Sequence, residues 1–76
     1  MRMNLVKENG LEREYYFGRK RNMVSYYKYK WCDEAKKYFP YYNKTFKAFE
    51  GLEQFEKSMR DKGFVSIAEL EAKKFN

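Results

Sequence analysis

Residues 11–31, LEREYYFGRKRNMVSYYKYKW, decide the fold that the sequence predicts. Two tyrosine-rich runs flank residues 18–22, and strand-forming runs joined by turn residues are typical of a β-hairpin, here with a five-residue loop. Three consecutive cations, Arg19, Lys20 and Arg21, lie at the expected tip. We therefore take this hairpin as the centre of the fold.

Side chains alternate between two faces along the second arm of the hairpin. We expect the face that runs from Met23 to Trp31 to be buried. The other face carries Tyr26, Lys28 and Lys30, and would then be exposed. The alternation predicts a basic, tyrosine-bearing surface on the sheet.

The segment before the hairpin predicts a first strand at residues 2–7. Asn9-Gly10 follows it, and this dipeptide is the strongest short signal for a two-residue type I′ turn. Such a turn would place Lys7 opposite Glu12, an opposite-charge pair across the ladder.

The segment after the hairpin is less regular. Residues 32–37 favour one helical turn, because acidic residues come first and basic residues last, the order that a helix dipole favours. Residues 38–43 indicate a connector, because Pro40 lacks the N–H group that a strand ladder uses. Residues 45–49 predict a fourth strand.

The C-terminal third predicts two helices, at residues 51–62 and 67–74. Leu52, Phe55 and Met59 share one stripe of the first helix. Gly63 occupies the position of a left-handed residue that ends the helix in a Schellman motif. Ser66 and Glu69 form a capping box that starts the second helix. These elements predict an α+β fold with two layers, in which a small antiparallel sheet of three to four strands, at about residues 2–31 and 45–49, packs on both helices in a single domain, 1–76.

Composition excludes several classes of protein. A chain of 76 residues supports one hydrophobic core. The single cysteine, Cys32, excludes an internal disulfide, and the absence of histidine removes the commonest general base and a zinc site of the Cys/His type. We therefore expect no enzyme, metal or cofactor. The chain shows neither a signal peptide nor a membrane span, which indicates a cytoplasmic protein that does not associate with a membrane.

The net charge of +6 is unevenly distributed. Residues 1–31 hold eight Lys or Arg and three Asp or Glu, or +5, whereas residues 32–49 carry +2 and residues 50–76 carry −1. A basic region rich in tyrosine is typical of a surface for phosphates and unpaired bases. We therefore expect a small basic, non-enzymatic protein that binds nucleic acid, in particular RNA or a single strand. The candidate residues are Arg19, Lys20, Arg21, Tyr26, Lys28, Lys30, Lys36, Lys37, Lys44 and Lys47.

A second interpretation is a protein-binding adaptor or inhibitor that acts on a host protein such as a nucleic-acid enzyme. Its candidate residues are Tyr38, Phe39, Tyr41 and Tyr42, which resemble the aromatic anchors of interfaces. The abundance of Lys, Asn, Tyr and Phe suggests an AT-rich gene, as in a phage accessory or anti-defence protein. A homodimer would also account for the surplus of aromatic side chains.

Overall fold

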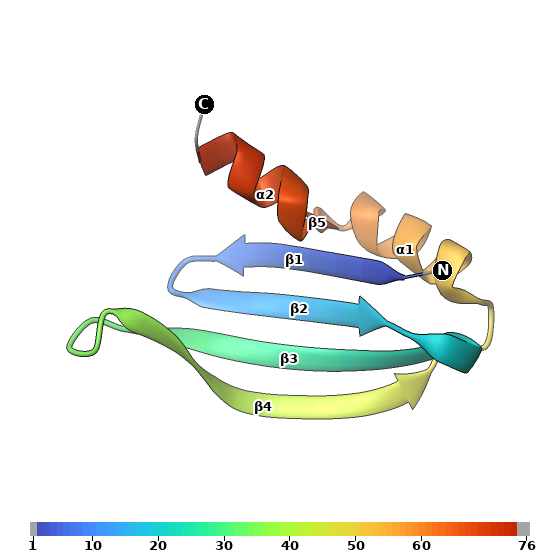
Figure 1. The fold of residues 1–76 in the computed structure, drawn as a ribbon, viewed down its shortest axis with the longest axis horizontal. Coiled ribbons are helices and arrows are strands. Elements are labelled where there is room, and N and C mark those ends of the chain that lie inside the picture. Colours follow the sequence, from blue (N-terminus) through green and yellow to red (C-terminus); the bar gives the residue numbers. More distant parts are fainter. Residues whose placement is uncertain (1, 75–76) are drawn as a thin grey trace.

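The computed structural model describes residues 2–74 and contains one sheet flanked by helices (Figure 1). In chain order the elements are β1 (Met3–Asn9), β2 (Glu12–Gly18), the 3₁₀ turn η1 (Lys20–Asn22), β3 (Met23–Cys32), β4 (Lys37–Lys47), α1 (Leu52–Asp61), β5 (Val65–Ser66) and α2 (Ile67–Lys74). The strands form an antiparallel sheet in the order β4-β3-β2-β1-β5. The α+β class is confirmed, but the sheet has five strands in the described part of the chain rather than three to four.

The loop between β1 and β2 begins one residue later than predicted. Asn9 still belongs to β1, so Lys7 pairs with Glu14 rather than Glu12. Gly10 holds the first loop position with φ of 64°, and glycine there is typical of a type II′ turn. The register differs by two residues from the prediction. Because side chains alternate with a period of two, the grouping of residues on each face is unchanged.

The loop between β2 and β3 has four residues, 19–22, rather than five. Gly18 still belongs to β2 and pairs with Val24 of β3. Arg21 and Asn22 both adopt the left-handed backbone conformation, with φ of 58° and 60°, which is uncommon for residues other than glycine. The hairpin is thus closed by a tight turn at the position of its three cations.

The segment predicted as a helical turn followed by a connector is instead a turn followed by a strand. β4 covers Lys37–Lys47. The helical turn predicted at residues 32–37 and the connector predicted at residues 38–43 were therefore wrong, and the strand predicted at residues 45–49 begins eight residues earlier and ends two residues earlier. Pro40 is tolerated because β4 is an edge strand, in which a missing N–H need not remove a ladder hydrogen bond. A bulge at Tyr41 shifts the register with β3.

The end of α1 has the geometry that the sequence predicts. The Phe64 N–H donates to the Met59 carbonyl at 3.1 Å and the Gly63 N–H to the Arg60 carbonyl at 3.0 Å, the two hydrogen bonds of a Schellman motif. Gly63 has φ of 99°. Phe64 and Met59 are both buried, which supplies the hydrophobic contact that accompanies the motif.

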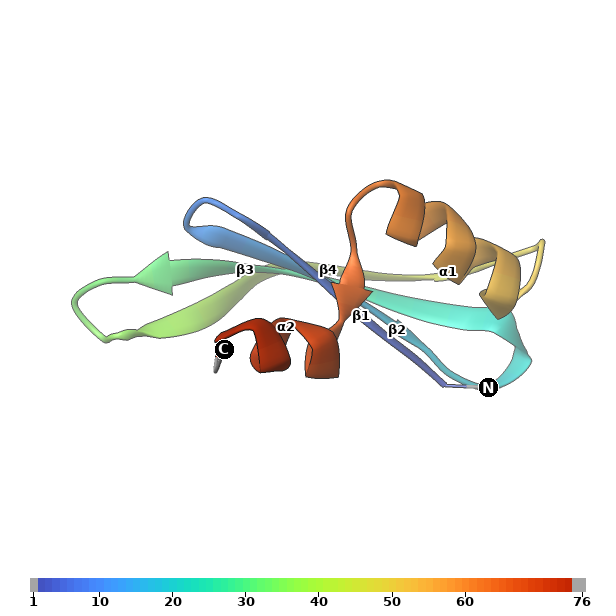
Figure 2. The ribbon, with the colours of Figure 1, turned by 90° about the horizontal axis from the view of Figure 1, so that it is seen from above.

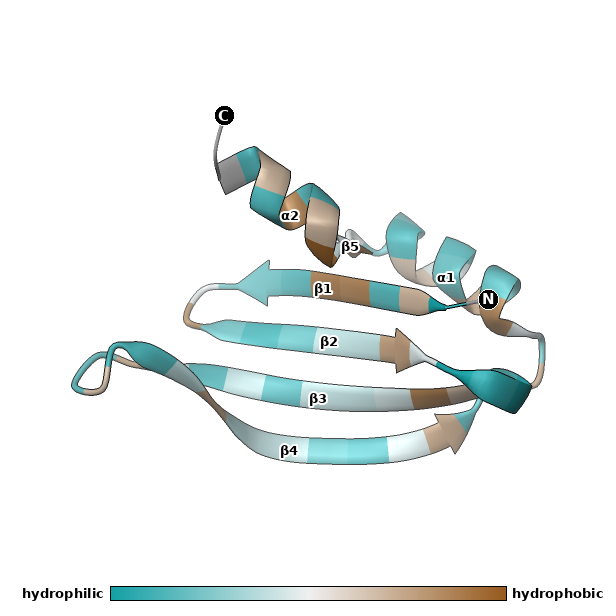
Figure 3. Ribbon diagram, viewed as in Figure 1, coloured by the Kyte–Doolittle hydropathy of each residue, from teal (hydrophilic) through white to brown (hydrophobic). Residues whose placement is uncertain are grey.

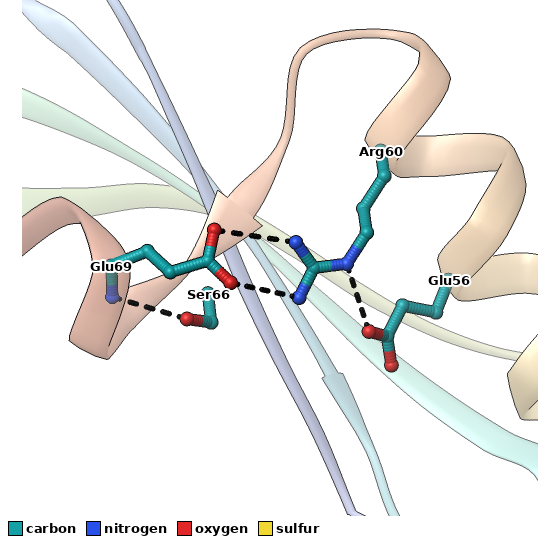
Figure 4. A network of polar contacts seen from close by, with 4 residues as sticks. All are labelled: Glu56, Arg60, Ser66 and Glu69. Carbon is teal, nitrogen blue, oxygen red and sulfur yellow. Dashed lines mark hydrogen bonds and ion pairs between the residues drawn. The ribbon is translucent and has the colours of Figure 1, made fainter.

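The start of α2 is also as predicted, and it is connected to α1 by charged side chains (Figure 4). The Glu69 N–H donates to Ser66 Oγ at 3.1 Å, as in a capping box. Arg60 of α1 donates to the Glu69 carboxylate through both terminal nitrogens and through Nε to Glu56 at 3.0 Å. One guanidinium therefore links the two helices.

The buried face of the sheet is the opposite of the one expected. The core cluster consists of Met3, Leu5, Val24, Ala48, Leu52, Met59 and Phe64. Val24 is fully buried and Met23 is 38% exposed. The two hairpin registers explain this result, because they place Val24 in line with Gly18 and Met3, where the apolar stripe of α1 packs. Hydrophobic residues gather in the strand halves near α1 (Figure 3).

The two helices lie on opposite sides of the sheet edge formed by β5 (Figure 2). α1 supplies Leu52 and Met59 to the core, whereas Ile67 and Leu70 of α2 are half-buried and lie outside that cluster. Val6 is fully buried and faces away from the core cluster, on the side where α2 lies. The expectation that both helices cover one face of the sheet was therefore wrong, because the β5 strand separates them.

Candidate nucleic-acid interface

An open hollow lies at the end of the β2–β3 hairpin, and we call it the tip hollow. Its volume is about 1060 Å³. It is lined by Arg2, Asn4, Phe17, Gly18, Arg19, Lys20, Arg21, Asn22, Glu50, Gly51, Leu52 and Glu53. Three segments distant in sequence meet here: the start of β1, the hairpin tip, and the chain entering α1.

Backbone hydrogen bonds position this end of the molecule. The Ala48 N–H donates to the Asn22 carbonyl at 2.8 Å, and the Gly51 N–H donates to the Ala48 carbonyl at 3.0 Å. The segment that leads into α1 is therefore held against the hairpin tip. Pairing of Met3 with Gly18 brings the start of β1 to the same place.

The tip hollow carries an excess of positive charge. Arg2, Arg19, Lys20 and Arg21 are all exposed, and none of them forms an ion pair with a residue in the described range 2–74. Two carboxylates, Glu50 and Glu53, also line the hollow. Four cations against two anions leave this end of the molecule basic. Such a surface is suited to an anionic group such as a phosphate.

Of the candidate residues, the structure brings Arg19, Lys20 and Arg21 together. Arg2 joins them, and sequence reasoning missed it. The pairing of Met3 with Gly18 is the signal that locates Arg2 beside the tip. The predicted register, although two residues out of place, also brings Arg2 to this end of the hairpin, so the turn signal was enough to locate it.

The prediction that Tyr26 is exposed was wrong. Its side chain lies on the side of the sheet that α1 covers and is 6% exposed. Its ring lies 4.7 Å from the Tyr16 ring, centroid to centroid, and its hydroxyl donates to the Glu14 carboxylate. Burial, and then the hydrogen bond to Glu14, raise the pKa of Tyr26 far above its ordinary value. The Tyr26 ring is therefore not available to stack on a base.

Lys28 and Lys30 lie away from the tip hollow, in the other half of β3. Their cross-strand neighbours on β2 are Glu14 and Glu12, respectively. Opposite charges paired across a ladder attract each other. Neither lysine forms an ion pair with a described residue, so each is only placed opposite a carboxylate of its own sheet.

The remaining four lysines are dispersed. Lys36 and Lys37 lie at the β3–β4 turn, about 30 Å from the hairpin tip at the usual rise of a strand. Lys36 forms an ion pair with Asp33 at 3.2 Å. Lys44 lies over the rings of Tyr26 and Phe46. Lys47 pairs with Met23 next to the hairpin tip but does not line the tip hollow, and it lies 6.0 Å from the Phe49 ring.

A group of aromatic rings occupies the side of the sheet opposite α1, and sequence reasoning missed this surface as well. We call it the tyrosine face and define it as Tyr15, Phe17, Tyr27 and Tyr29. Tyr15 and Phe17 are parallel within 4° at 5.8 Å, Tyr15 meets Tyr29 edge-on at 5.3 Å, and Phe17 meets Tyr27 edge-on at 5.8 Å. All four side chains are half-buried. Tyrosine tolerates such a position because its hydroxyl stays in water.

Arg13 and Tyr38 extend the tyrosine face toward β4. The Arg13 guanidinium lies 4.3 Å from the Tyr38 ring centroid and forms an ion pair with Glu8 at 3.1 Å. Burial lowers the pKa of Arg13, but its hydrogen bonds with Tyr15 and Glu8 outweigh that effect and raise it. Tyr38 thus packs within the sheet.

The other residues proposed for protein binding are on the edge strand. Phe39, Tyr41 and Tyr42 are 42%, 52% and 47% exposed. The Tyr41 hydroxyl donates to the Glu12 carboxylate, and this hydrogen bond raises the pKa of Tyr41. These three side chains form an exposed aromatic strip along the outer strand.

Neither described helix is long and apolar enough to cross a membrane. Comparison of the chain with protein-family models, with curated proteins and with solved structures found no match.

Proposed function

We propose that this protein binds nucleic acid, without catalysis, and that the tip hollow contacts the phosphates. The observation that carries the proposal is the meeting of Arg2, Arg19, Lys20 and Arg21 around one hollow, with no ion pair to a described residue. Arginine donates paired hydrogen bonds to phosphate oxygens, and lysine contributes a point charge. The net charge of +6 favours a polyanion in the same way.

Contacts of this kind orient a nucleic acid but do not select its sequence. We therefore propose binding with little base preference and strong dependence on salt. For single strands, the slope of log affinity against log salt is about −0.7 for each phosphate contacted. Three to four contacts at the tip hollow would give a slope between about −2 and −3.

Fluorescence anisotropy with a labelled oligonucleotide tests this proposal. The triple variant Arg19→Ala, Lys20→Ala, Arg21→Ala should bind more weakly and show a shallower salt slope than the unmodified protein. The matched control is Lys28→Ala, Lys30→Ala, which removes cations that already have carboxylates opposite them. Equal losses in the two variants, or no binding at low salt, would reject the tip hollow as a phosphate site.

A second candidate function is protein binding along β4. The observation in its favour is the exposed strip of Phe39, Tyr41 and Tyr42 on an edge strand. An edge strand offers unpaired backbone groups to a strand of another protein, and neighbouring side chains add specificity. Under this proposal the chain is an adaptor or inhibitor, and nuclease treatment should leave a stoichiometric partner bound. Tyr42→Ala should release that partner, whereas the triple tip variant should retain it.

A further inference from the structure

We infer that the tyrosine face holds the unpaired bases of a single-stranded nucleic acid whose phosphates occupy the tip hollow. The inference rests on the proposed function and adds to it the class of nucleic acid and a second contact surface. Neither helix covers this surface: α1 lies on the other side of the sheet, and α2 lies beyond β1, away from β2–β4 (Figures 1 and 2).

The rings of the tyrosine face are held in place by one another. Each of Tyr15 and Phe17 on β2 contacts a ring of β3, and Tyr27 lies 6.4 Å from Tyr29. Tyr15 and Tyr27 are also direct partners in the ladder. Rings fixed in advance lose little side-chain freedom when a ligand stacks on them. Aromatic stacking accepts any base, because every base has a flat π-face.

The charges around this surface favour a polyanion over a second copy of the chain. The acidic residues of β2–β4 are Glu12 and Glu14, and their pairing places both on the opposite side of the sheet. On the tyrosine side, Glu8 of β1 is already paired with Arg13. Two copies of a chain with a charge of +6 would repel when brought face to face.

The tyrosine face is continuous with the tip hollow. Phe17 belongs to the face and also lines the hollow, and its ladder partner Asn4 lines the hollow beside it. A nucleic-acid strand with one phosphate against Arg19 can therefore place its next bases along Phe17 and Tyr15. Bases in a duplex are stacked on each other and expose no face, so this arrangement selects a single strand.

The test compares a 15-nucleotide oligothymidine with a 15-base-pair duplex at one salt concentration, using anisotropy and the fluorescence of Trp31, the single tryptophan of the chain. Trp31 lies on the tyrosine side of β3, 5.0 Å from the Tyr38 ring. We expect the single strand to bind at least about tenfold more tightly than the duplex and to quench Trp31. The variant Tyr15→Leu, Tyr27→Leu keeps apolar bulk but removes the stacking rings. It should lose about tenfold or more in affinity for the single strand. Tyr42→Leu, which changes an exposed tyrosine on the edge strand, is the matched control and should bind normally.

The outcomes separate this inference from the proposed function. The tip variant is the triple substitution Arg19→Ala, Lys20→Ala, Arg21→Ala. If it loses binding but the unmodified protein binds single strand and duplex equally, the tyrosine face does not bind bases and the phosphate site remains. If the tip variant binds normally, the proposed function fails first. A dimer in sedimentation that the Tyr15→Leu, Tyr27→Leu variant converts to a monomer would instead assign this face to a second copy.

Photocrosslinking covers the case in which the double variant does not fold. An oligonucleotide containing 5-bromouracil, crosslinked to the unmodified protein, should label peptides that contain Tyr15, Phe17 or Tyr27. Labelling confined to β4 or to α1 would overturn the inference.

Discussion

Gly18 at the end of β2 lies directly against Leu52 at the start of α1. A Cβ atom added to Gly18 would stand 3.0 Å from Leu52 Cδ2 and 2.9 Å from the Met3 Cβ atom. The absence of a side chain at this position lets the helix approach the sheet. Gly18 and Leu52 both line the tip hollow.

Replacing this glycine should destabilise the fold by overpacking. For Gly18→Ala we expect a loss of about 1–3 kcal/mol in the free energy of unfolding, because the Met3 contact involves a Cβ atom that cannot move without its backbone. Urea unfolding followed by circular dichroism measures the loss. Leu11→Ala, at an exposed loop position, should change the value by less than about 0.5 kcal/mol. Equal values for the two variants would contradict the packing argument.

Lys7 of β1 supports the C-terminal end of α1. Its ammonium donates to the Lys62 carbonyl at 2.8 Å, and a cation at this end of a helix is favoured by the helix dipole. Lys7→Met keeps most of the apolar stem that lies beside Gly63 and removes the charge. We expect a loss of about 0.5–1 kcal/mol in thermal or urea unfolding. The loss should shrink at high salt, since screening weakens the charge interaction.

The link between Arg60 and Glu69 should make the helix pair sensitive to acid. Hydrogen bonding to Arg60 lowers the pKa of Glu69 below its ordinary value of 4.5. A lowered pKa in the folded state means that the stabilisation is complete above about pH 4.5 and is lost as the pH falls through the folded-state value. Glu69→Gln should be less stable than the unmodified protein at pH 7, with the difference disappearing in acid. A difference that stays constant from pH 7 to pH 2 would contradict this.

The stability that the hydrogen bond from Tyr26 to Glu14 contributes should be lost at high pH rather than at low pH. Burial and this hydrogen bond raise the pKa of Tyr26 above its ordinary value of 10.0. Stability is therefore complete below about pH 10 and falls as the pH rises further, because the unfolded chain releases the phenolic proton more readily. Tyr26→Phe should cost about 1–2 kcal/mol at pH 7. The difference in unfolding free energy between Tyr26→Phe and the unmodified protein should become smaller between pH 10 and pH 11, as measured by urea unfolding at each pH.

The site was only partly predictable from the chain. Arg19, Lys20 and Arg21 are adjacent in sequence, so any hairpin with its tip there keeps them together. Arg2 joins them through the pairing of β1 with β2, so it could be located only by following the β1–β2 turn back to the start of the first strand. The alternation along β3 correctly divides the residues of that strand into two sets, but it does not say which set faces the helix. The tyrosine face was missed for this reason.

Local chemistry by itself determined the two helices, the end of the first, the start of the second, and the hairpin at residues 11–31. Gly63 and Ser66 mark helix ends because glycine adopts positive φ without cost and a serine hydroxyl accepts from a nearby backbone N–H. The tertiary structure alone decided which sheet face is buried, that the helices lie on opposite sides of the sheet, and that residues 38–43 form a strand. Those outcomes depend on contacts between distant segments. Pro40 is acceptable once its strand lies at an edge, and Val24 is buried once Gly18 leaves room for Leu52.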